Sequence, residues 1–276
     1  MLAAALIPVR LMADPIMYTF TWGGGVLQTF DASSTASPTD IGPMGVQAKF
    51  GGLAYDTFNN TMYMVDGTGD DQSTNHSSLY TVNLSTGAAT LIGSTGLSQA
   101  ELTGITYDSA NNTLYGAQDI SGAPLVTLNI STGAATAVGT GIAAGEEVDN
   151  VAYDSTNGVL YGWSDCLGCA ALYSIDTTTG VGTLLNGTGL DSNDSQLVYD
   201  PVTNLLWDLD VRGILTTIDP STFTQSAVVG GPVITTEPSG LALIPGASTT
   251  TPEPSTVVFI GGGMAALFLR LKRRAR

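Results

Sequence analysis

The chain has 276 residues, in which 24 acidic residues outnumber 8 Lys and Arg residues and give a formal net charge of −16. Five of the basic residues lie at positions 270–276 and a sixth is Arg10, so residues 14–255 hold all 24 acids but only Lys49 and Arg212 as basic residues. This length suffices for one or two domains, and the acidity disfavours nucleic acid and anionic membrane surfaces as partners of residues 14–255 while favouring cations or basic partners.

The first 13 residues, MLAAALIPVRLMA, resemble part of a secretory signal. They are apolar and end in a small residue before Asp14, but they lack a basic start and Arg10 interrupts them. We expect a partial signal whose true start lies upstream. The alternative is that this segment is not a signal.

Four copies of one unit follow, each made of four short apolar alternations separated by Asp, Asn, Thr and Gly. The first strands each contain a tyrosine, and these tyrosines are 52, 46 and 46 residues apart: Tyr55, Tyr107, Tyr153 and Tyr199. The predicted strands are 52–56, 104–108, 150–154 and 196–200 (first), 61–65, 113–117, 159–163 and 205–209 (second), 78–83, 124–129, 171–176 and 214–219 (third), and 89–93, 135–139, 182–186 and 226–230 (fourth). A period of 40–50 residues with four strands per unit predicts a β-propeller.

The ends of the repeat region set the number of blades. Segments 17–22, 26–31 and 39–42 match the second, third and fourth strands, and segment 240–244 matches a first strand. The sequence therefore predicts an all-β, five-bladed β-propeller of four-stranded antiparallel blades over residues 16–245. Pairing of the N- and C-terminal strands would close it and remove an exposed edge. A six-bladed ring would need a further blade, and the rungs of an open β-solenoid would be shorter.

The recurrent polar residues have structural interpretations. Each first strand ends in an Asp before a turn sequence, which predicts that the side chain binds backbone N–H groups of the turn: Asp56, Asp108, Asp154 and Asp200. A second turn places Gly87, Gly133 and Gly180 where a left-handed residue is needed. The strand tyrosines are predicted to pack between blades.

The two cysteines, Cys166 and Cys169, are spaced C-L-G-C. Two cysteines and a distant His76 do not make a four-ligand zinc site. In an exported protein a disulfide that closes this loop is expected. The alternative is a redox-active pair.

Strand order predicts that the loops between second and third strands, and between fourth and first strands, share one face of the propeller. These loops collect 13 acids: Asp66, Asp70, Asp71, Glu101, Asp119, Glu146, Glu147, Asp149, Asp165, Asp191, Asp194, Asp210 and Glu237. Carboxylates suit Ca²⁺, and we hypothesise a calcium site at Asp66, Asp70 and Asp71 in the longest loop. The alternative is that these loops are simply solvated.

Motifs of catalysis are absent from the sequence. It contains no G-x-S-x-G, H-E-x-x-H or P-loop, and its single histidine leaves no basis for a conventional triad. Chemistry that uses two carboxylates, as in glycoside cleavage, needs only two placed acids, and the sequence does not identify such a pair.

The C-terminal region has three parts. A Ser/Thr/Pro linker over residues 246–255 contains Pro252-Glu253-Pro254. Residues 256–276 are predicted to form a membrane helix with a basic tail. The apolar run extends from Val257 to Leu269 and includes Phe259 and Leu267, and the basic stop consists of Arg270, Lys272, Arg273 and Arg274. Basic residues after an apolar run are typical of a cytoplasmic stop-transfer signal.

This order resembles the PEP-CTERM sorting signal of Gram-negative bacteria. The resemblance implies a transient inner-membrane anchor, processing near Pro252 by an exosortase, and delivery to the cell surface or extracellular matrix. It implies no single activity. Our hypothesis is a non-enzymatic surface or biofilm-matrix protein that binds an exopolysaccharide or protein through one propeller face, with no certain cofactor. The alternatives are a Ca²⁺-dependent lactonase- or lyase-like enzyme that uses face carboxylates, and a purely structural matrix component.

Overall fold

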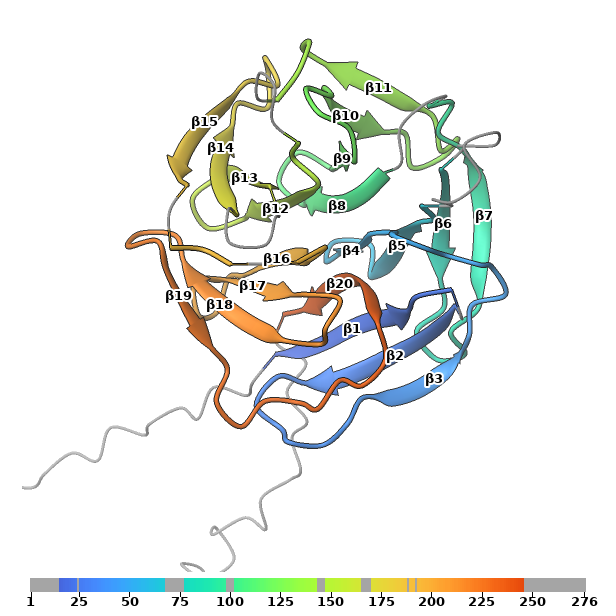
Figure 1. Cartoon of the computed structure of the whole chain (residues 1–276). Coiled ribbons are helices and arrows are strands. Elements are labelled where there is room, and N and C mark those ends of the chain that lie inside the picture. The colour runs from blue at the N-terminus through green and yellow to red at the C-terminus, as the bar shows by residue number, and fades with distance from the viewer. Residues whose placement is uncertain are drawn as a thin grey trace, which may run out of the picture. The chain divides into compact units, whose positions relative to one another are not determined.

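The computed structural model describes residues 15–23, 25–67, 77–97, 102–142, 147–164, 170–187, 189–191 and 193–245. These residues form five four-stranded antiparallel sheets arranged around a ring (Figure 1). No helix among them is long and apolar enough to span a membrane. The predicted C-terminal helix lies outside the described residues.

The first blade is built from both ends of the described chain. Its strands, from the centre outward, are β20 (Pro238–Ile244), β1 (Ile16–Thr21), β2 (Val26–Asp31) and β3 (Thr39–Pro43). β20 pairs antiparallel with β1, and Ile244 lies opposite Ile16. The predicted closure of the ring is therefore confirmed.

Each of the other four blades is continuous in sequence. Blade 2 contains β4 (Leu53–Asp56), β5 (Thr61–Val65), β6 (Ser78–Val82) and β7 (Ala89–Ser94), and blade 3 contains β8 (Leu102–Asp108), β9 (Thr113–Gln118), β10 (Leu125–Leu128) and β11 (Ala135–Val138). Blade 4 contains β12 (Asn150–Asp154), β13 (Val159–Ser164), β14 (Ala171–Ile175) and β15 (Gly182–Asn186), and blade 5 contains β16 (Gln196–Asp200), β17 (Leu205–Leu209), β18 (Leu215–Asp219) and β19 (Thr224–Ala227). The innermost strands β4, β8, β12, β16 and β20 contact one another in this order around the ring.

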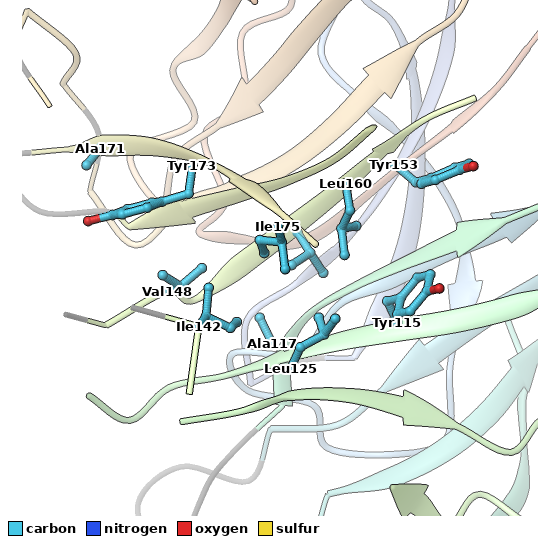
Figure 2. Packing of buried hydrophobic residues seen from close by; sticks show 11 residues of the cluster. Tyr115, Ala117, Leu125, Ile142, Val148, Tyr153, Leu160, Ala171, Tyr173 and Ile175 are labelled. Carbon is cyan, nitrogen blue, oxygen red and sulfur yellow. The ribbon is translucent and has the colours of Figure 1, made fainter. Parts of the chain in front are cut away.

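The hydrophobic core is divided into five clusters, one between each pair of neighbouring blades. Figure 2 shows the cluster between blades 3 and 4, where Tyr115 of β9 and Tyr153 of β12 contribute aromatic rings. The same relation recurs between blades 2 and 3, where the Tyr63 and Tyr107 rings stack with centroids 6.1 Å apart. The prediction that the strand tyrosines pack between blades is confirmed.

The Asp residue that ends each inner strand organises the following turn. In blade 2, Asp56 Oδ1 accepts hydrogen bonds from the backbone N–H groups of Phe58 and Asn59 at 2.8 and 3.0 Å, and Oδ2 accepts one from the Asn59 amide at 2.7 Å. Asp108 and Asp154 repeat this pattern, and Asp200 accepts bonds from Val202 and Thr203. The predicted turn role of these buried aspartates is confirmed.

Candidate functional site

A cavity of about 210 Å³ opens at one end of the ring of inner strands. Its walls come from the first residues of inner strands and from the loops that precede them or follow the second strands. We call this cavity and its rim the acidic mouth, which is lined by Phe50, Thr103, Asp119, Glu147, Asp149, Asn150, Asp194, Ser195, Gln196, Val211 and Ser239. These positions lie on the face predicted to collect the acids.

Three carboxylates converge at the acidic mouth. Asp119 directly follows β9, whereas Glu147 and Asp149 lie just before β12 in the next blade. One carboxylate oxygen from each lies within 4.8 Å of the others, and Asp149 is buried while Asp119 and Glu147 are exposed. Oxygen atoms at this separation are close enough to share one cation.

A fourth carboxylate, Asp194, lies in the loop before β16. Burial raises the pKa of Asp194 above its ordinary value, and the negative charge of Asp119 raises it further. The carboxylates of Asp119 and Asp194 therefore interact electrostatically, although they come from blades 3 and 5. None of the described residues that line the cavity is basic.

Hydrogen bonds between blades fix the walls of the acidic mouth. The Thr103 hydroxyl of β8 donates to the backbone carbonyl of Asp149 at 2.6 Å, and the Asn150 amide donates to the backbone carbonyl of Ser195. The Trp163 indole donates to the Ser195 hydroxyl at 2.9 Å. Blades 3, 4 and 5 are therefore tied together at this cavity by buried polar contacts, which favour a preformed site.

Gln196 is the first residue of β16 and lines the same cavity. It is only 8% exposed, yet its side-chain amide makes no hydrogen bond to any residue that the structure describes. The amide atoms are not among the fully buried polar atoms without a partner, and the residue lines the cavity, where water or a ligand can satisfy them. The Gln196 side chain therefore offers an amide oxygen and an amide N–H group to a ligand.

The opposite end of the ring differs in size and chemistry. There the ends of the inner strands surround a hollow of about 70 Å³ that includes Tyr55, Tyr107, Tyr153 and Tyr199 and has no described carboxylate in its lining. A third hollow, of about 330 Å³, lies at the hairpin turns of blades 4 and 5, where Asp154 is already bonded to its own turn. Convergent carboxylates thus distinguish the acidic mouth from both other hollows.

The two basic residues of the propeller lie outside the lining of the acidic mouth. Arg212 forms an ion pair with Asp210, and its Nε donates to the same carboxylate at 2.6 Å. The Lys49 ammonium lies 5.2 Å from the centroid of the Trp22 ring, in a cation–π contact. The carboxylate of Asp210 is therefore bonded to Arg212, and Asp210 is not part of the cavity lining.

Asp66, the described member of the hypothesised calcium loop, is buried at the end of β5. Its Oδ1 accepts the Ser78 N–H at 2.6 Å, and its Oδ2 accepts the Tyr80 hydroxyl at 2.8 Å. Both carboxylate oxygens of Asp66 therefore fix the start of β6 beside the end of β5. Asp70 and Asp71 lie outside the described residues, so the calcium site at this loop stays a prediction.

We expect Asp66→Asn to keep or raise the free energy of unfolding at pH 7, whereas Asp66→Ala lowers it by about 1–3 kcal/mol through loss of both bonds. Burial raises the pKa of Asp66 above 3.8, against the hydrogen bonds from Ser78 and Tyr80. A raised carboxylate pKa means that stability falls as pH increases from about 4 through the folded-state pKa. The Asn variant should lose the part of this decline that comes from Asp66, so its decline should be smaller than that of the wild type.

Urea unfolding of both variants at several pH values between 4 and 7 checks this expectation. A wild-type free energy of unfolding that increases with pH over this interval, with no increase in the Asn variant, would contradict it. Asp66→Ala serves as the control for loss of the two hydrogen bonds without retention of an acceptor.

Several predicted site residues lie outside the described part of the chain. These are the disulfide pair Cys166 and Cys169, the sorting motif Pro252-Glu253-Pro254, the membrane segment with Val257, Phe259, Leu267 and Leu269, and the basic stop at Arg270, Lys272, Arg273 and Arg274. Sequence reasoning placed Asp119, Glu147, Asp149 and Asp194 on the correct face but did not single them out. It missed Gln196.

Comparisons with known proteins support the C-terminal sorting motif and the propeller fold. Residues 250–274 match the PEP-CTERM protein-sorting motif, so the chain carries this motif at its C-terminus. No curated protein matches the chain in sequence. A chain in the crystal structure of a nidogen/laminin complex is similar in fold, with a TM-score of 0.57 and 13% identity, over 83% of this chain and 97% of that one.

A structural genomics protein of unknown function from Bacteroides thetaiotaomicron is also similar, with a TM-score of 0.52 and 14% identity. The alignment covers 76% of this chain and 57% of that protein. At such low identities the likeness concerns the propeller fold alone.

Proposed function

We propose that this PEP-CTERM protein is a non-enzymatic, surface-delivered binding protein that holds a segment of polysaccharide in the acidic mouth. The observation that carries the proposal is the cavity itself, which is about 210 Å³ in volume and lined by carboxylate, amide and hydroxyl groups from several blades. Concave sites with a few convergent polar groups are the usual form of ligand sites in proteins.

The chemistry of the lining favours a neutral or basic polyhydroxylated ligand. Carboxylates accept hydrogen bonds from sugar hydroxyls, and the Gln196 amide can both donate and accept. Phe50 is the aromatic residue among those that line the same cavity. The surrounding negative charge opposes polyanions. A surface protein with a basic segment is the alternative partner that the same chemistry allows.

The sorting motif supports the cellular setting of the proposal. A PEP-CTERM motif implies export and processing by an exosortase. We propose that the apolar run after the motif anchors the chain transiently in the inner membrane, and that the propeller then reaches the cell surface or extracellular matrix. A binding role fits this setting, since a closed ring of blades presents its loops rigidly.

Binding of the purified protein to a panel of neutral, basic and acidic soluble polysaccharides tests the proposal. We expect the double variant Asp194→Asn, Gln196→Leu to weaken binding of the selected polysaccharide at least about tenfold, as for other central contacts of an interface. Asn is suitable at position 194 because the backbone there has a positive φ of 45°.

The matched control is Asp219→Asn, which removes one carboxylate at the opposite face. Asp219 Oδ1 accepts bonds from Ser221, and an Asn side chain retains this acceptor. Unchanged binding in the double variant, or equal losses in both variants, would refute a role for the acidic mouth. Binding only to a basic protein segment would favour the alternative partner.

A cation-dependent enzyme of the lactonase or lyase kind is the second candidate. It is favoured by the convergence of Asp119, Glu147 and Asp149, because hydrolytic and lyase chemistry needs several charged groups at one point. An enzyme would turn over lactone or uronate substrates, and Asp149→Asn would abolish turnover while substrate still binds. A binding protein would show no turnover before or after this substitution.

A further inference from the structure

We infer that the acidic mouth holds a divalent cation of the Ca²⁺ type, with Asp119, Glu147 and Asp149 as charged ligands and Gln196 as a neutral oxygen donor facing the same cavity. The inference rests on the proposed function in one respect, since it concerns the same cavity. It assigns a metal site that differs from the loop at Asp66, Asp70 and Asp71.

The first observation is the distance between the three carboxylates. Their oxygens lie within 4.8 Å of one another, although Asp119 comes from blade 3 and the other two precede the inner strand of blade 4. Two oxygens bound to one Ca²⁺ at 2.3–2.6 Å are separated by at most about 5 Å. The observed separation therefore needs no large rearrangement of the backbone.

The second observation is independent of the acidic cluster. Gln196 lines the cavity from blade 5, is 8% exposed, and makes no hydrogen bond within the described residues. The backbone carbonyl of its neighbour Ser195 accepts a hydrogen bond from the side-chain amide of Asn150, which directly follows Asp149. The wall that carries Gln196 is thus joined to the wall that carries Asp149, and Gln196 lines the same cavity as the three carboxylates.

The charge of the cluster is compatible with a cation. Three carboxylates at this separation repel one another, and a bound divalent cation would reduce this repulsion. The lining of the hollow at the opposite end of the ring contains no described carboxylate and offers no comparable cluster.

The donor set selects the type of metal. All candidate donors are oxygen atoms, and the described lining contains no His or Cys, which disfavours Zn²⁺ and Cu²⁺. Mg²⁺ requires near-ideal octahedral geometry with shorter bonds, whereas Ca²⁺ accepts six to eight oxygens in irregular arrangements. Ligands supplied by separate loops of three blades match the less demanding geometry.

Calorimetry and thermal unfolding of the full chain, after removal of metal with EDTA, test the inference with CaCl₂ alone as the probe. We expect saturable binding of one Ca²⁺ and an increase in the midpoint temperature of unfolding. Glu147→Gln and Asp119→Asn should each weaken Ca²⁺ binding at least about tenfold, because ligand charge sets affinity. Both residues are exposed, so these variants are expected to fold.

Glu237→Gln is the matched control, since Glu237 is an exposed acid of the same face outside the cavity lining. The inference is overturned if millimolar Ca²⁺ gives neither heat nor a change in midpoint temperature. It is also overturned if Glu147→Gln and Asp119→Asn bind Ca²⁺ like the wild type while Asp70→Asn does not, which would place the metal in the loop at Asp66.

Polysaccharide binding measured in EDTA separates this inference from the proposed function. If binding to the acidic mouth persists and Ca²⁺ alone gives no heat, the metal inference fails and the proposed function stands. If Ca²⁺ binds at Asp119 and Glu147 but no polysaccharide is retained, the metal inference stands and the proposed function fails.

Discussion

A chain that ends at Glu237 is expected to lose cooperative folding, although it retains 19 of the 20 described strands. The missing strand, β20, is the inner strand of blade 1 and pairs with β1 along its length. Leu241 and Leu243 are 2% and 5% exposed, and burying two leucines contributes about 3–6 kcal/mol. This loss is comparable to the whole stability of a typical domain, about 5–15 kcal/mol.

Near-UV circular dichroism and urea unfolding of this shortened chain check the expectation, with a chain that ends at Ala247 as the first control. The second control is a permuted chain in which residues 236–247 precede residue 14. Because Ile244 lies opposite Ile16, a short turn can join β20 to β1 in the native register. The permuted chain should unfold cooperatively, and cooperative unfolding of the chain that ends at Glu237 would contradict the closure argument.

The fold could be predicted because the same pattern of strand and turn residues recurs along the sequence. The tyrosine and the aspartate recur in the inner strands of blades 2 to 5, and the glycine recurs in the outer turns of blades 2 to 4, at spacings of 46 to 52 residues. Each of these residues has the predicted structural role. The shared blade was predictable from order alone, since segments 17–22 and 240–244 match a second and a first strand. The structure places them as β1 and β20.

One outer strand was predicted less well than the other strands. The fourth strand of blade 5 was predicted at 226–230 and is observed as β19, Thr224–Ala227. An edge strand has a neighbour on one side only, and the residues of β19 are mostly exposed. Hydrophobic alternation, which marks buried strands, is therefore weak there.

The site was predictable only to the level of a face. Strand order placed 13 acids on that face, but it does not show which side chains point into the ring. Asp119 and Asp149 are 30 residues apart, and their convergence depends on how blades 3 and 4 pack. Asp66 shows the same limit, because its bonds to Ser78 and Tyr80 cross a loop and leave no trace in local sequence.

Gly133→Ala is expected to have the largest effect of any single substitution considered for this propeller. Gly133 lies in the turn between β10 and β11 with a φ of +82°, and an added Cβ would lie 2.3 Å from the backbone oxygen of Gly93 in β7. The left-handed backbone costs a non-glycine residue about 1–2 kcal/mol. Forcing blades 2 and 3 apart should cost about 1–3 kcal/mol more.

Gly96→Ala separates these two contributions. Gly96 has a similar φ of +76°, but an added Cβ would meet nothing within 4 Å. Its substitution should therefore show the backbone cost alone, and the difference between the two variants in urea unfolding measures the contact between blades. Equal losses of free energy of unfolding would mean that the turn of blade 3 does not press on the edge strand of blade 2. A larger loss for Gly133→Ala would show that the close approach of neighbouring blades depends on the absence of a side chain at this turn.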